Sequence, residues 1–316
     1  MDFSLTPHQE QRHQQGRALG HDLTGAWTAA EAIGKARAIG FLAPDPDGVG
    51  DVLLLEAVAA EAAAPAVALA LHTAVVRAWT TGRTGDRVAA VALTSEPVPT
   101  IEGERLHGRA AWLAPVAPGG VAVVGARRGA VLTACLVALD APGVSLHVVE
   151  PSGLSGLPCA HVDLDGAAFE DMEAPQPVMA VARLFLAAVG LGIARRALRE
   201  ALRSATHYGR TGPGGEQTLH GLIADVATEL DAAMVVAWDA ALQRPVRLAQ
   251  ASMAKLLATE AAQRAVLRAT QVVGVASFEH GHVLERLSHD VRALELFAGR
   301  TEALREAVAD QVLPRT

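Results

Sequence analysis

Side chains with metal-binding or nucleophilic chemistry gather in two short stretches, and neither has the spacing of a complete site. Glu279, His280 and His282 could ligate a metal ion, but no further ligands follow at the spacing of a zinc site, so we expect a solvated loop. Ser155 lies in Gly-Leu-Ser-Gly, which lacks the G-x-S-x-G spacing of a nucleophile elbow. Neither stretch predicts a catalytic centre.

Glycine and arginine patterns in the second half of the chain have structural explanations as well. Gly190 and Gly192 form a G-x-G fragment inside a helical pattern with no strand before it, which indicates close helix packing and not nucleotide binding. Four arginines form one charged helix face, which we interpret as a solvated or intersubunit surface: Arg195, Arg196, Arg199 and Arg203.

The composition favours a mostly helical protein. Of the 316 residues, 51% are hydrophobic but only 3% are aromatic, and alanine-rich faces favour closely packed helices. The formal net charge of −7 gives no basic footprint for nucleic acid. Cys135 and Cys159 are too few for a disulfide framework. The amino terminus is polar and polar residues interrupt the apolar stretch at 58–76, so we expect a cytoplasmic chain without a membrane span.

The first part of the chain has a helical pattern. Thr6 and Gln9 have the spacing of a capping box, and Pro7 occupies the first helical position, which together predict a helix start. Two further helices are expected at Trp27–Ile39 and Val52–Trp79.

The middle of the chain changes to an extended pattern before helices return. From 88 to 150, short β-branched runs broken by glycine and proline predict strands, with one more at His161–Phe169. Four long amphipathic segments then predict a four-helix bundle: Met179–Tyr208, Gln217–Gln243, Ala249–Val273 and Val283–Val312. The fold class is therefore α+β, with a helical domain at 1–87, a β-barrel or sandwich domain at 88–175 and the bundle at 176–316.

One series of residues near the end of the chain resembles a known signature. Without a gap, the letters Q-x-x-G, E-R-x-x-x-D and G-x-x-E are matched by Gln271, Gly274, Glu285, Arg286, Asp290, Gly299 and Glu302. They resemble the carboxyl-terminal signature of the acyl-CoA dehydrogenases, a family of flavoproteins. Shorter likenesses place Thr94, Trp112 and Lys255 on family motifs, so the resemblance covers essentially the whole chain, with an abbreviated first domain. It implies this family's fold, FAD as cofactor, and α,β-dehydrogenation of an acyl-CoA or acyl-carrier thioester.

The resemblance also implies that the usual catalytic base is missing. Family members remove the proton beside the thioester carbonyl with a glutamate, which occupies one of two positions. Here both positions are alanine, Ala298 and Ala182. Glu295 and Glu302 flank the first position, and on a helix both would point about one turn away.

The resemblance implies seven contacts to FAD, and several depart from the family pattern. The positions are Thr94, Trp112, Arg210, Gln271, Gly274, Gly299 and Arg300. Ala114 and Arg300 replace threonines that contact the flavin ring in the family, and the loop around Arg210 is shortened. Val275 replaces a glycine in a turn that approaches the dinucleotide of a neighbouring subunit, where glycine tolerates positive φ.

Three functions are compatible with these departures. The first is a subunit similar to the degenerate, non-catalytic chain of heterotetrameric actinobacterial acyl-CoA dehydrogenases, which completes an FAD and thioester site with a fuller partner chain. The second is a self-sufficient but divergent dehydrogenase with an unconventional base. The third is a binding or structural protein that keeps the fold without flavin. In each case we expect assembly with another such chain or with a second copy, and no metal site.

Overall fold

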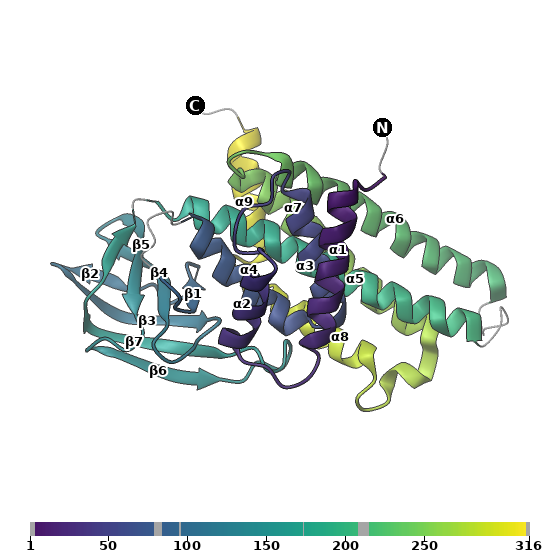
Figure 1. Cartoon of the computed structure of the whole chain (residues 1–316), viewed down its shortest axis with the longest axis horizontal. Helices are drawn as coiled ribbons and strands as arrows, with labels where there is room; N and C mark the ends of the chain where they lie inside the picture. Colours follow the sequence, from purple (N-terminus) through teal and green to yellow (C-terminus); the bar gives the residue numbers. More distant parts are fainter. Residues whose placement is uncertain (1–3, 79–83, 95, 173, 208–214, 314–316) are drawn as a thin grey trace.

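The computed structural model describes residues 4–78, 84–94, 96–172, 174–207 and 215–313. Helices form one end of the molecule and strands the other (Figure 1). Four helices come first: α1 (Pro7–Asp22), α2 (Ala29–Ala38), α3 (Val49–Glu61) and α4 (Ala63–Ala78). Eight strands follow in the described part: β1 (Ala89–Ala92), β2 (Thr100–Glu102), β3 (Arg105–Leu113), β4 (Val121–Arg128), β5 (Val131–Ala138), β6 (Val144–Val149), β7 (Cys159–Ala167) and β8 (Glu170–Met172). The last helices are α5 (Gln176–His207), α6 (Gly215–Leu242), α7 (Leu248–Val273), the 3-10 helix η1 (Gly274–Phe278), α8 (Val283–Leu294) and α9 (Thr301–Val312).

The amino-terminal helices confirm one prediction and correct another. The Thr6 hydroxyl accepts from the Gln9 backbone N–H at 3.3 Å, and the Gln9 side chain accepts from the Thr6 N–H at 3.0 Å, so the capping box is present. The single helix expected at Val52–Trp79 is wrong, because the chain breaks at Ala62 into α3 and α4. Pro65 explains the break, since proline lacks an N–H and its ring clashes with the carbonyl four residues earlier.

The strands form one sheet with the order β6-β7-β3-β2-β4-β5-β8, and β1 pairs in parallel with β4. Alternate side chains of these strands form a core of their own, which includes Leu106, Val124 and Val162. The other side chains of β1 and β4, such as Val91 and Val123, join the larger core that the helices share. The sheet is thereby fixed against α4, and this junction holds the cavity described below.

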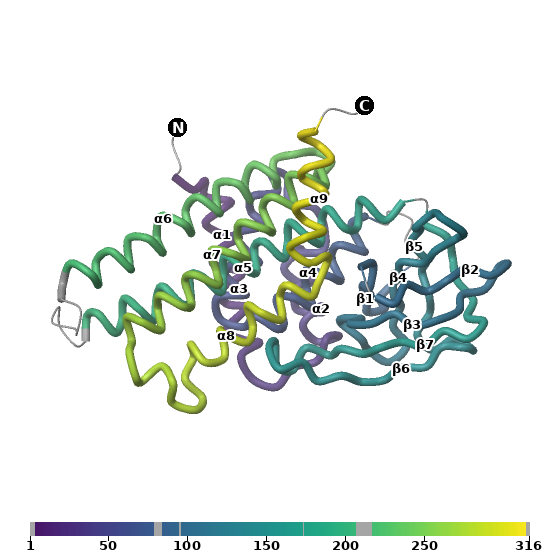
Figure 2. Tube along the Cα trace, turned by 180° about the vertical axis from the view of Figure 1, so that it is seen from behind, coloured from purple at the N-terminus to yellow at the C-terminus, as the bar shows by residue number. Residues whose placement is uncertain are grey.

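The carboxyl-terminal helices pack side by side along the length of the molecule, with α5 against α7 and α6 against α7 (Figure 2). The single helix expected at Val283–Val312 is wrong, because a turn at 295–300 separates α8 from α9. α8 ends at Leu294, and within the turn Ala298 and Gly299 have positive φ values of 56° and 104°, which a continuous helix does not allow.

Close helix packing explains the glycine pair of α5. A side chain at Gly192 would come within 2.4 Å of the Glu56 carbonyl oxygen of α3, and one at Gly190 within 3.3 Å of the Ala258 backbone of α7. The packing interpretation of the G-x-G fragment is thus confirmed.

The charged face of α5 is mainly an intramolecular contact, which corrects the expectation of a solvated or intersubunit surface. Arg195 pairs with Glu56, while Arg196 and Arg199 donate to Glu61 at 3.0 and 2.7 Å. These carboxylates lie on α3, some 135 to 139 residues earlier in the chain. No local pattern could have shown the pairing. Arg203, the fourth member of this face, lies near Glu200 of its own helix and is largely exposed.

Among the described helices, the segment Gln176–Thr206 is long and apolar enough to cross a membrane by length and composition. Its most apolar window is 89% buried inside the structure. Such burial is also typical of the central helix of a bundle.

Candidate functional site

A cavity of about 440 Å³ lies where the sheet meets the turn between α8 and α9. Leu93, Thr94 and Trp112 line it from the sheet, and residues 296–300 line it from the turn. α4 contributes Leu71. A concave space of this size, with apolar walls and a few polar groups, is typical of a small-molecule site.

Two residues that line the cavity have a strained backbone. Trp112 and Ala298 both have a φ of 56°, and they are two of the three non-glycine residues with positive φ in the described part of the chain. Trp112 lies where the pairing of β3 with β7 shifts register. Its backbone N–H donates to Nδ1 of His161 at 3.3 Å. The rings of these two residues also meet edge to face, with centroids 5.7 Å apart. Such strain costs about 1–3 kcal/mol and clusters at functional sites.

Lys255 of α7 supports the turn from the interior. Its side chain is buried, and Nζ donates to the carbonyl oxygens of Phe297 and, at 2.8 Å, Gly299. Burial, and then the charge of Arg183, lowers the pKa of Lys255 to about 7, although Glu295 opposes the shift. Near neutral pH the folded chain therefore favours the charged ammonium of Lys255 only weakly over the neutral amine.

Arg183 of α5 binds the carbonyl of Ala298, which lies between Phe297 and Gly299 in the turn. Its Nε donates to the Ala298 oxygen at 2.9 Å, and Nη1 donates to Ser252 Oγ at 2.7 Å. Burial lowers the pKa of Arg183 to about 10. Within the described residues, no carboxylate forms an ion pair with Arg183 or Lys255. Three consecutive carbonyls thus face two cations, and uncompensated positive charge lies next to the cavity.

Further charged groups line the mouth of the cavity. Arg127, Arg300 and Glu96 contribute to its wall, and Glu96 is the only carboxylate among the described lining residues. Arg300 Nη2 lies 3.7 Å from Glu96 Oε2, with the two side chains 68% and 78% exposed. Exposed pairs of this kind contribute only about 0–1 kcal/mol. Sequence reasoning missed Arg127 as a site residue because no motif marks it. Glu96 resembles part of the same family motif as Thr94, but it was given no role in the site.

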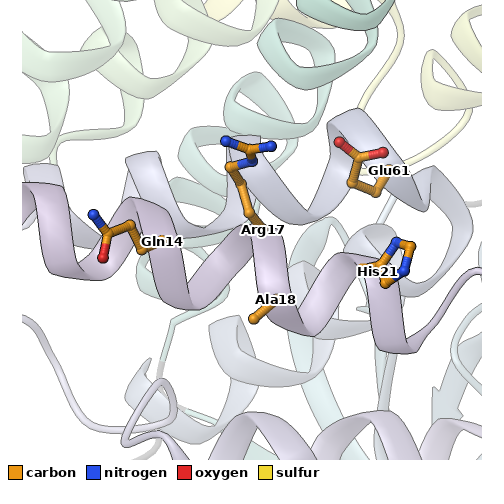
Figure 3. Close-up of a pocket in the computed structure, with 5 residues that line it drawn as sticks. All are labelled: Gln14, Arg17, Ala18, His21 and Glu61. Carbon is orange, nitrogen blue, oxygen red and sulfur yellow. The ribbon is translucent and has the colours of Figure 1, made fainter.

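A second hollow, of about 470 Å³, lies on the helical side between α1 and the end of α3 (Figure 3). It is lined by Gln14, Arg17, Ala18, His21 and Glu61. Glu61 is already engaged by Arg196 and Arg199 of α5. Since its one carboxylate is paired and the α1 side chains are exposed, this hollow has no evident chemistry.

The loop that contains Glu279, His280 and His282 caps the amino-terminal end of α8. His282 Nδ1 accepts from the Leu284 N–H at 3.2 Å, and Glu285 accepts from the Gly281 N–H at 2.8 Å. Across the residues described, no group of three or more His, Cys, Asp or Glu side chains is arranged to hold a metal ion.

Comparison with known proteins shows which family this chain resembles. Residues 172–313 match the family model described as "Acyl-CoA dehydrogenase, C-terminal domain". The chain is also 28% identical over 260 residues to benzylmalonyl-CoA dehydrogenase of Aromatoleum aromaticum, a match covering 72% of this chain and 69% of the relative. The chain is thus similar to the acyl-CoA dehydrogenases, and its carboxyl-terminal part matches their family model. In the first four sequence relatives, the matched part spans 50% to 69% of the relative's own length.

Solved structures share the fold over the full length of the chain. Butyryl-CoA dehydrogenase from Megasphaera elsdenii superimposes with a TM-score of 0.84, covering 99% of this chain and 100% of that one at 17% identity. The structure of PigA with FAD and proline gives a TM-score of 0.82, with 99% of each chain covered at 20% identity. The α+β architecture of the acyl-CoA dehydrogenases, including its helical and β parts, is therefore confirmed.

Only one of the two family base positions reaches the cavity. Ala298 lines it, whereas Ala182 is fully buried in the helical core and does not. Glu295 accepts a hydrogen bond from Gln263 and does not line the cavity. Glu302 is exposed at the start of α9 and does not line it either.

The residues at which the family would bind flavin divide into two groups. Four of them line the cavity: Thr94, Trp112, Gly299 and Arg300. Gln271 and Gly274 lie at the end of α7 and the start of η1, at the other end of the molecule from the strands (Figures 1 and 2). Ala114 is buried in the core and does not line the cavity, while Arg210 lies outside the described residues.

Proposed function

We propose that this chain is a subunit of an acyl-CoA dehydrogenase-like enzyme that completes an FAD and acyl-thioester site with a fuller partner chain, its own base being lost. Similarity to this family supports the reaction class, which is α,β-dehydrogenation. The observation that carries the proposal is the methyl group of Ala298 at the cavity wall. A methyl group cannot accept the α-proton, and removal of that proton needs a positioned carboxylate or similar base.

The cavity is compatible with the ring end of FAD. The Trp112 indole, the Thr94 hydroxyl and the backbone at Gly299 offer apolar contact and hydrogen-bonding groups around one concave space. When bound, FAD would supply the acceptor for the β-hydrogen. PigA, which shares this fold, has been solved with FAD, and this supports the same cofactor here.

The outer end of the bundle supports a role toward a second chain. Gln271 is exposed, Gly274 has a φ of 74°, and Val275 is 88% exposed. These residues cannot reach the cavity of their own chain, because the length of α7 separates the two. We infer that this end contributes to the dinucleotide site of the partner, either a second acyl-CoA dehydrogenase-like chain or another copy.

Within its own cavity, the chain's residues bind and orient a thioester without taking a proton from it. Lys255 and Arg183 fix the carbonyls of 297–299, so the turn is held rigidly against the ligand. Residues on such a support are positioned more precisely than residues on a free loop.

A self-sufficient but divergent dehydrogenase, acting on an acyl-CoA or acyl-carrier substrate, is the second candidate, and Glu96 favours it. Its carboxylate is the only one that lines the cavity in the described part of the chain. It lies on the sheet side and is 78% exposed, next to Arg300. A base in this position would have to reach the α-carbon from a different wall than the family's glutamate does.

Visible absorption and acyl-CoA oxidation test the proposal. The chain is purified alone and after co-expression with an acyl-CoA dehydrogenase encoded beside it. We expect flavin colour and acyl-CoA oxidation only in the co-purified complex. Yellow protein that oxidises acyl-CoA alone would establish the second candidate instead, and absence of colour in both preparations would show a binding or structural protein without flavin.

A further inference from the structure

Two arginines reach the mouth of the cavity from distant parts of the chain. Arg127 lies near the end of β4, and Arg300 immediately precedes α9. Among the described residues, the Arg127 guanidinium has no ion pair and no side-chain hydrogen bond. Arg300 has only the exposed contact with Glu96 at 3.7 Å. Guanidinium groups in such a position are suited to carboxylate or phosphate, which they bind through charge-assisted hydrogen bonds.

The surroundings add to the positive charge at this mouth. Behind the turn, Arg183 and Lys255 face carbonyl oxygens and have no carboxylate partner in the described structure. Among the described residues, Glu96 is the only acid that lines the cavity. Glu295 acts on Lys255 from the interior, and Glu302 lies exposed two residues after Arg300. Cations therefore outnumber carboxylates around the cavity. A cleft lined by one sign of charge concentrates its field and attracts ligands of the opposite sign.

We propose that Arg127 and Arg300 form an anion-binding site at the mouth of the cavity, which takes a carboxylate or phosphate group of the bound molecule. The inference deepens the proposed function, on which it rests for the nature of that molecule. A carboxylate on the acyl group and a phosphate on the cofactor present the same chemistry to the two arginines. Glu96 competes with the ligand for Arg300 and thereby limits the affinity.

Binding calorimetry with two matched pairs of probes tests this site. FMN and riboflavin differ by one phosphate, and the N-acetylcysteamine thioesters of glutarate and of its methyl ester differ by one free carboxylate. We expect at least one anionic probe to bind about tenfold more tightly than its neutral match, as one charge-assisted contact predicts. The advantage should shrink in 0.5 M salt, which screens exposed charges.

Variants at the mouth give effects of opposite sign. R127Q and R300Q should each remove most of the advantage of the anionic probe and leave the neutral probe unchanged. E96Q should raise the affinity for the anion about threefold, because it frees Arg300 and removes a like charge. R128Q is the matched control, since Arg128 is the next residue of β4 and pairs with Asp171. R305Q is the control on α9, where Arg305 pairs with Glu260.

The pairs of probes identify the source of the anion and separate the two hypotheses. An arginine-dependent advantage for FMN assigns the site to a phosphate, and one for the carboxylated thioester assigns it to the acyl group. If neither anionic probe exceeds its neutral match, or if R127Q and R300Q behave like R128Q, the anion site is wrong even when both flavins bind. If no flavin binds but the carboxylated thioester does so through the arginines, the anion site is supported and flavin binding by this chain fails.

Discussion

Two groups of cations in the interior of this molecule differ in their partners. In the amino-terminal part, Arg12 contacts Asp51 at 2.9 Å and Asp45 at 3.3 Å, and Arg77 pairs with Asp51 as well. Each cation there is matched by a carboxylate. Beneath the cavity, the two cations that support the turn have only carbonyl oxygens and a hydroxyl as partners.

The difference separates a cluster with balanced charge from one with unbalanced charge. The balanced cluster joins α1, the loop before α3, α3 and α4, and its charges cancel locally. The unbalanced pair leaves positive potential beside a concave space, where burial lowers the pKa of Lys255 to about 7. Desolvated charge without a counter-ion is costly. Here hydrogen bonds to three carbonyls and one hydroxyl offset part of that cost.

The largest effect should come from breaking the balanced cluster. Asp51→Ala leaves Arg12 and Arg77 without a carboxylate they share, and removal of one partner of a buried pair costs about 3–5 kcal/mol. Urea unfolding would measure this loss in the free energy of unfolding. Asp86→Ala, which breaks the exposed contact with Arg37, is the control and should leave stability nearly unchanged. Equal effects of the two variants would contradict the structural role of the cluster.

An intermediate effect should separate the two family base positions. Ala182→Glu places a carboxylate in a fully buried helix face, which combines overpacking with an unpaired polar group and should cost about 3 kcal/mol. Ala298→Glu extends into the cavity, and the position already holds a non-glycine residue at positive φ, so we expect a loss below about 1 kcal/mol. Thermal unfolding of both variants measures the contrast. A severe loss for Ala298→Glu would show that the cavity has no room for a side chain at this wall.

The last prediction is a pH dependence of stability at Lys255. The pKa of this lysine is lowered to about 7 in the folded chain from about 10.4 when unfolded, so unfolding takes up a proton between these values. The free energy of unfolding should therefore rise with pH from about 7 to about 10, by up to about 1.4 kcal/mol per pH unit. Lys255→Met should lose this rise, whereas Lys35→Met, at an exposed pair with Glu31, should retain it. Parallel pH profiles for wild type and Lys255→Met would exclude the effect.

Local patterns in the sequence predicted what depends on local physics. The capping box of α1 and the long apolar faces of α5, α6 and α7 gave helices within a few residues of their observed bounds. The strand β8, which is only three residues long and lies beyond the runs predicted as extended, was missed. The breaks at Ala62 and at 295–300 were also missed, although Pro65 was a visible signal for the first.

The chemistry of the site could not be predicted in the same way, because it depends on contacts between distant residues. Lys255 binds carbonyls 42 and 44 residues further along the chain. Arg127, Glu96 and Arg300 come together around one cavity only in the folded chain. The family resemblance gave the positions of Thr94, Trp112, Gly299 and Arg300, and the cavity that joins them appears only in the fold.

Removal of the α-proton is the step that most directly tests the loss of the base. The chain alone, supplied with FAD, is incubated with an acyl-CoA in D₂O without oxygen, and NMR follows deuterium entering the α-carbon. We predict no incorporation above the protein-free rate. Incorporation by Ala298→Glu would show that a carboxylate is the one group this cavity lacks for the step. If the unchanged chain incorporates deuterium and Glu96→Gln abolishes that incorporation, the loss of the base is contradicted and Glu96 is identified as its replacement.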